Sequence, residues 1–125
     1  MTSASPRTLA AALAAVLAAS GTLHLVRPQT FDPIVPRALP GERRTWTLVS
    51  GYAELATAAA LAAKPSRRIG GSLAALLFVA VFPANIVMAR QYLRSSKTTR
   101  TAKAIVLARL PLQVPLVLFA LRARG

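Results

Sequence analysis

Four long apolar blocks, separated by short polar and basic segments, are the feature that most constrains the fold of this chain. The blocks cover residues 8–26, 45–63, 69–89 and 104–121. A helix needs about 20 apolar residues to cross the hydrocarbon core of a bilayer. None of the blocks alternates polar and apolar residues with a period of two, so a transmembrane β-barrel is excluded. The sequence therefore predicts an all-α, up-down bundle of four transmembrane helices.

We expect one membrane domain over residues 1–125, multi-pass in the cell membrane, with helices at about 7–26, 44–63, 67–92 and 103–122. The first block also resembles a cleaved signal peptide, because a basic residue precedes an alanine- and leucine-rich run that ends at small residues. Its apolar run is longer than a typical signal core, so we favour its retention as a helix. Cleavage would leave three spans.

The charge balance is strongly basic, with 16 Lys and Arg against three Asp and Glu, a formal net charge of +13. The basic residues lie in the gaps between the apolar blocks, which is typical of membrane flanks and unlike the basic patch of a nucleic-acid-binding protein. The chain has no cysteine and one histidine, which argues against a disulfide framework and a protein-only metal site. We therefore expect the lipid bilayer as partner, and neither nucleic acid nor a metal.

Four spans place both ends of the chain and the turn at 64–68 on one side of the membrane, here called side A. Side B consists of the loops at 27–44 and 90–103. Nine basic residues lie on side B and six on side A, so the positive-inside rule favours side B in the cytoplasm by a narrow margin. The six basic residues of side A are Arg7, Lys64, Arg67, Arg68, Arg122 and Arg124.

The loop between the first two predicted helices combines four prolines with apolar residues at helical spacing. Asp32 followed by Pro33 is a favourable start for a helix. We therefore expect one or two short amphipathic turns at the membrane interface, over the bundle, with an irregular proline-rich loop as an equal alternative. The apolar residues that fall on one helical face are Phe31, Ile34, Val35, Ala38 and Leu39.

Five polar residues inside the predicted spans are the candidate functional residues. Lipid makes such side chains costly, so they usually face the bundle interior and mark functional sites. At a rise of about 1.5 Å per residue, all five lie in the half of the membrane next to side B. The five residues are His24, Glu54, Asn85, Arg109 and Gln113.

Glu54 and Arg109 are the two opposite charges within the spans, at predicted depths of about 13 Å and about 9 Å from side B. This difference is less than the reach of an arginine side chain, so we predict a buried Glu54–Arg109 ion pair. Breaking one member of such a pair costs about 3–5 kcal/mol, because the other charge stays buried. We expect the five polar residues together to line a ligand pocket. The alternative is that they only fix the four helices together.

Five short motifs contain or adjoin these candidate residues: Gly21 to His24, Phe31 to Pro40, Ser50 to Glu54, Phe82 to Asn85, and Arg109 to Gln113. In their order along the chain they resemble the DoxX-like family of small four-helix membrane proteins, over about residues 21–113. The resemblance implies a four-helix fold. The family's named members are similar to the membrane subunit of a thiosulfate:quinone oxidoreductase and to a membrane component with oxidative-stress and thiol-handling partners.

The sequence supports two functions. In the first, the polar pocket binds a quinone or a similar small molecule without a covalent bond, and a partner protein docks on the side-B loops. The chain would then be a redox-associated module and, if an enzyme at all, a subunit of a quinone-linked oxidoreductase. Arginine, histidine and amide groups are suitable donors to a quinone carbonyl. In the second, the chain is a non-catalytic scaffold or assembly factor whose basic loops recruit a protein or anionic lipid. Association into a homo-oligomer is left open.

Overall fold

The computed structural model describes residues 5–125, and all regular structure in that range is helical. The predicted all-α fold class is therefore confirmed. Three 3₁₀ turns join the α-helices: η1 (Pro28–Thr30), η2 (Asp32–Ile34) and η3 (Lys64–Ser66). The α-helices are α1 (Pro6–Val26), α2 (Arg43–Ala62), α3 (Arg67–Ala80), α4 (Phe82–Arg94) and α5 (Arg100–Arg122).

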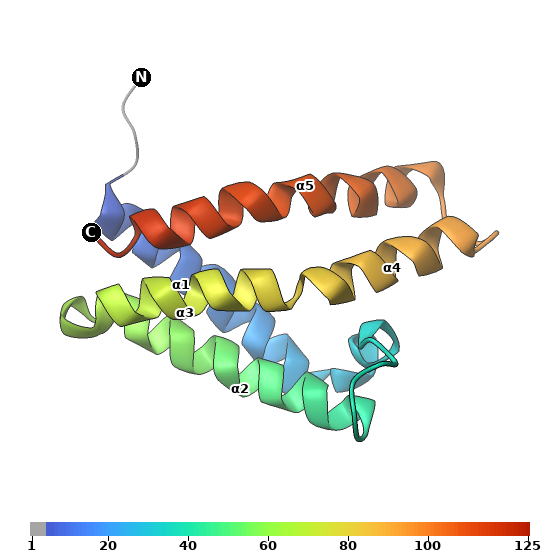
Figure 1. Ribbon diagram of the computed structural model, residues 1–125, viewed down its shortest axis with the longest axis horizontal. Helices are drawn as coiled ribbons and strands as arrows, with labels where there is room; N and C mark the ends of the chain where they lie inside the picture. Colours follow the sequence, from blue (N-terminus) through green and yellow to red (C-terminus); the bar gives the residue numbers. More distant parts are fainter. Residues whose placement is uncertain (1–4) are drawn as a thin grey trace.

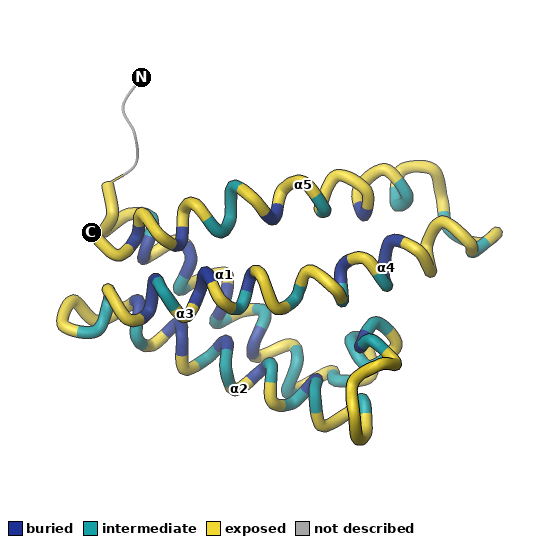
Figure 2. The backbone as a smooth tube through the Cα atoms, in the orientation of Figure 1, coloured by how far each residue is buried: buried dark blue, intermediate teal, exposed yellow. Residues whose placement is uncertain are grey.

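Three helical segments of the described chain are long and apolar enough to cross a membrane. They are Pro6–Val26, Lys64–Arg94, which contains α3 and α4, and Arg100–Arg122. α2 is not one of them, because Glu54 and several hydroxyl-bearing residues lower its hydropathy. Many large apolar residues of the long segments are exposed, and exposed positions run along much of the bundle in Figure 2. A bilayer favours such an apolar surface, whereas water does not.

The helices run back and forth between two ends of the molecule. The start of α1, the α2–α3 turn and the end of α5 lie at one end, which is side A (Figure 1). The segment with η1 and η2 and the connection between α4 and α5 lie at the other end, side B. α1 packs mainly against α2, whereas α5 packs along α3 and α4.

The third predicted helix, at 67–92, is two helices, so residues 5–125 contain five α-helices where four were expected. α3 ends at Ala80, and Val81 separates it from α4. The physical reason is Pro83, which has no N–H to donate and whose ring clashes with the carbonyl four residues earlier. The chain stays nearly continuous, since the Val81 N–H donates to the Leu77 carbonyl at 2.9 Å and the Asn85 N–H to the Val81 carbonyl at 3.0 Å.

The half of the bundle near side A has a closely packed apolar core. Small residues let the helices approach: a Cβ atom on Gly70 would lie 2.6 Å from the Leu61 backbone nitrogen, so only glycine fits at this α2–α3 contact. In the same way, a Cβ atom on Gly71 would lie 2.7 Å from the Ala120 carbonyl oxygen of α5. The core cluster consists of Ala10, Leu13, Leu17, Ala58, Leu61, Ala74, Ala75, Phe78, Ala120 and Ala123.

The segment between α1 and α2 combines features of both predicted forms. It has two short 3₁₀ turns, as the prediction of one or two turns requires, and its helical part ends at Ile34. Ala38 and Leu39, expected on its apolar face, are exposed. Asp32 does not cap a helix as predicted, because its carboxylate is engaged by side chains of α2.

Candidate functional site

The five polar residues predicted from the sequence line one cavity of about 220 Å³, in the half of the bundle near side B. They come from α1, α2, α4 and α5, so the cavity depends on the assembled bundle. The break between α3 and α4 forms part of its wall, through Phe78 and Val81. The segment between α1 and α2 covers it. The residues of that segment that line the cavity are Phe31, Ile34 and Val35.

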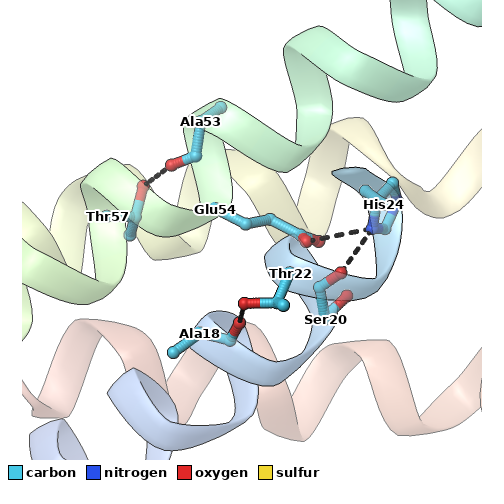
Figure 3. A network of polar contacts seen from close by, with 7 residues as sticks. All are labelled: Ala18, Ser20, Thr22, His24, Ala53, Glu54 and Thr57. Atoms are coloured by element: carbon cyan, nitrogen blue, oxygen red, sulfur yellow. Dashed lines mark hydrogen bonds and ion pairs between the residues drawn. The ribbon is translucent and has the colours of Figure 1, made fainter. Parts of the chain in front are cut away.

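One wall of the cavity is a histidine–carboxylate pair between α1 and α2 (Figure 3). The Nδ1 atom of His24 lies 2.7 Å from the Ser20 carbonyl oxygen and 3.3 Å from Oε2 of Glu54. A carbonyl only accepts, so the Nδ1 proton points to Ser20. Oε2 of Glu54 is consequently buried without a hydrogen-bond partner, and Glu54 as a whole is 7% exposed.

Two glycines set the distance between the helices that carry this pair. A Cβ atom on Gly21 of α1 would lie 2.8 Å from the Gly51 carbonyl oxygen, and one on Gly51 of α2 would lie 2.8 Å from Cβ of His24. Any larger residue would push α1 and α2 apart. The glycines of two of the sequence motifs therefore bring His24 within reach of Glu54.

The opposite wall is an amide chain that joins α5 to the break between α3 and α4. The Asn85 side-chain amide donates to Oε1 of Gln113 at 3.2 Å, and the Gln113 amide in turn donates to the Phe78 carbonyl. Asn85 and Gln113 are 6% and 7% exposed. A backbone carbonyl buried in a bilayer needs a donor, and Gln113 supplies one at the position where Pro83 interrupts the helix.

The predicted Glu54–Arg109 ion pair is wrong. Glu54 pairs with His24, and the only other ion pair within residues 5–125 joins Arg44 to Asp32. The depth estimate did not fix the direction of the side chains around the helix axes. α5 packs on α3 and α4 and not on α2, so Arg109 is exposed at the edge of the cavity that it lines.

Polar contacts hold the covering segment on both sides. The Asp32 carboxylate accepts hydrogen bonds from Oγ1 of Thr47 at 2.7 Å and from Nε of Arg44 at 2.8 Å. The Gln91 amide of α4 donates to the Pro33 carbonyl at 2.6 Å. Beneath these contacts, the Phe31 ring stacks on His24 with ring centroids 3.7 Å apart. The segment is thus a cover fixed to α2 and α4.

The environment of Asp32 favours its charged form. Burial alone would raise the pKa of this carboxyl. The hydrogen bonds from Thr47 and Arg44, with the positive charges of Arg44 and Arg43, outweigh burial and hold the pKa below its ordinary value of 3.8. The contact between cover and α2 is therefore charged at neutral pH.

Sequence reasoning missed three polar residues that border the cavity: Ser20, Thr47 and Ser50. Ser20 precedes His24 by four residues and Ser50 precedes Glu54 by four, a spacing that places each pair on one helix face. That spacing was the available signal. Within residues 5–125 there is no group of three or more His, Asp or Glu residues that could hold a metal ion.

Comparison with known proteins gives a family without an assigned function. Residues 13–124 match the family model described as Domain of unknown function (DUF8561). The match covers most of the chain and includes all five predicted polar residues, so the chain belongs to this family. No curated protein and no solved structure matches it. The resemblance to the DoxX-like family is not tested by these comparisons and stays a prediction.

Proposed function

We propose that this member of the DUF8561 family is a multi-pass protein of the cell membrane that binds a small lipophilic molecule in its polar cavity. In this proposal α2 is a fourth span, beside the three segments that are apolar enough to cross alone. Its 20 residues match the length of a span. Its polar residues Thr47, Glu54 and Thr57 are buried in the protein, where lipid does not meet them.

The single observation that carries the proposal is the convergence of five polar side chains from four helices on one cavity. A bundle that needed them only as structural links would join each to a protein partner. The buried Oε2 atom of Glu54 lies 3.3 Å from Nδ1 of His24 but accepts no hydrogen bond, and a buried acceptor without a hydrogen bond costs about 1–3 kcal/mol. A ligand that donates a hydrogen bond to this carboxylate would recover part of that cost.

The chemistry of the cavity favours a molecule with an apolar body and polar groups at two ends. Glu54 provides an acceptor on the α1–α2 side, and Arg109 provides donors and a positive charge on the α5 side. Leu17, Phe78 and Leu116 add apolar surface to the lining. The volume of about 220 Å³ is below that of a typical drug-sized site, which favours a single ring.

A quinone or quinol head group has this form, so we propose that class of ligand. Its hydroxyl, in the reduced form, would donate to Glu54, and its other oxygen would accept from Arg109. The resemblance to the DoxX-like family supports the same class and implies a redox-associated module. A partner protein on the side-B loops would supply or accept the electrons.

The test is direct binding of decylubiquinone and its reduced form to the purified protein in lipid nanodiscs, measured by isothermal titration calorimetry. We expect saturable binding to the wild type, and at least a tenfold loss in Arg109→Ala and in His24→Ala. Arg122→Ala is the matched control, because this exposed arginine lies on the same helix but outside the cavity. Circular dichroism checks that each variant keeps its helices.

A second function, a non-catalytic scaffold, is favoured by the chain of hydrogen bonds from Asn85 through Gln113 to the Phe78 carbonyl, which needs no ligand. Under this alternative, no quinone binds and the cavity variants lose stability alone. The binding proposal is rejected if folded wild-type protein shows no saturable binding. It is also rejected if the cavity variants bind as well as Arg122→Ala.

A further inference from the structure

Side A has a second pocket, at the opposite end of the molecule from the polar cavity. It is open, has a volume of about 600 Å³, and is lined by the start of α1 and by residues around the turn that joins α2 to α3. Figure 1 shows both of these segments at the side-A end of the bundle. Three of its six lining residues are cations that come from two segments far apart in the sequence. The lining residues are Ser5, Pro6, Arg7, Ala62, Lys64 and Arg67.

None of the three cations of this pocket forms an ion pair within residues 5–125. The three acidic residues of the chain are Asp32, Glu42 and Glu54, and both ion pairs in the described residues use Asp32 or Glu54. Glu54 lies ten residues before Lys64, about 15 Å along the helix. Side A therefore gathers positive charge that the fold does not neutralise.

Hydrogen bonds within the protein do not explain why three cations lie at this pocket. The Ser5 hydroxyl accepts from the Thr8 N–H and so caps α1. Nε of Arg67 is 3.5 Å from the Leu61 carbonyl, a long contact at the end of α2, and its other guanidinium nitrogens remain available. Arg7 and Lys64 are exposed. An anion in the pocket would meet all three cations.

The level of the pocket in the membrane indicates which kind of anion it would bind. Two segments that are apolar enough to cross a membrane, Pro6–Val26 and Lys64–Arg94, both begin at this pocket. The pocket thus lies at the level of the lipid headgroups, with Pro6 and Ala62 as its apolar part. Basic pockets between transmembrane helices bind lipid headgroups, and a guanidinium matches phosphate in geometry. We infer that this pocket binds the phosphate of an anionic phospholipid from the leaflet at side A.

The test compares two triple variants that remove the same charge from the same side. Arg7→Gln/Lys64→Gln/Arg67→Gln removes the cations of the pocket. Arg68→Gln/Arg122→Gln/Arg124→Gln removes the three other basic residues of side A, which do not line it. Each protein is placed in nanodiscs of phosphatidylcholine with one fifth phosphatidylglycerol. Native mass spectrometry then counts the phosphatidylglycerol molecules that stay bound after the protein is released from the nanodisc.

We expect retention of phosphatidylglycerol to fall on the order of a hundredfold in the pocket variant, at about fivefold for each cation. The control variant should retain it nearly as wild type does. Equal losses in both variants would indicate diffuse surface attraction and overturn the inference, as would no loss in either.

A parallel titration with inorganic phosphate distinguishes a lipid headgroup from a soluble anion as the bound group. If millimolar phosphate displaces the lipid, the pocket is a site for a soluble anion and the lipid assignment is wrong.

Discussion

The two halves of the bundle hold their helices together in different ways. Near side A, alanines and glycines let the helices touch backbone to backbone, as at Gly70 and Leu61. Near side B, polar side chains and a broken helix hold the helices around a cavity. The first half is therefore held by close backbone packing, and the second by side-chain hydrogen bonds around an open space. A membrane bundle cannot gain stability from water exclusion between helices, so close packing takes that role.

The largest expected effect comes from disturbing the packed half. Gly70→Ala places a methyl group 2.6 Å from the Leu61 nitrogen and 2.8 Å from the Ala60 carbonyl carbon, both rigid backbone atoms. α2 and α3 must separate, so we expect a loss of about 3 kcal/mol or more in the free energy of unfolding. Unfolding in mixed detergent micelles, followed by circular dichroism, measures it. Ala59→Leu, on an exposed part of α2, is the control and should change stability little.

A smaller effect is expected from the amide chain in the open half. Gln113→Leu leaves the Phe78 carbonyl without its side-chain donor and Asn85 without its acceptor. We expect a loss of about 1–3 kcal/mol in the same unfolding measurement. The double variant Asn85→Leu/Gln113→Leu should lose less than the sum of the two single changes, because both break one network. Strict additivity would mean that the two amides act independently. It would contradict a connected series of hydrogen bonds from Asn85 through Gln113 to Phe78.

The smallest effect concerns the cover over the cavity. The pKa of Asp32 is lower in the folded protein than its ordinary value of 3.8. Its contribution to stability is therefore complete above that value and is lost as the pH falls through the lower, folded pKa. The contact is close to the surface, so its contribution is below about 1 kcal/mol.

This contribution can be isolated with Asp32→Asn. Trp46, the single tryptophan, donates to the Pro40 carbonyl at 2.7 Å and reports on this segment by its fluorescence. Between pH 6 and pH 3 the wild type should show a transition below about pH 4 that Asp32→Asn lacks. If both proteins change alike, the acid sensitivity belongs to other carboxylates and Asp32 does not anchor the cover.

The sequence was informative about the open half because polar residues in apolar blocks are rare and costly. It identified His24, Glu54, Asn85, Arg109 and Gln113, and the structure brings all five to one cavity. It did not identify which of them touch. Depth along a helix follows from residue count, but the direction around the axis depends on how each helix packs. Arg109 is at a suitable depth and still does not pair with Glu54, since α5 packs on α3 and α4.

The sequence by itself determined the all-helical class, the long apolar segments and the level at which the polar side chains lie, because these follow from composition and from the fixed rise of a helix. Only the tertiary structure decided the partners. The glycine contact between α1 and α2 brings His24 to Glu54, and the helix break before Pro83 gives Gln113 its acceptor. Such partners depend on the relative rotation of packed helices, and that rotation is a property of the whole bundle.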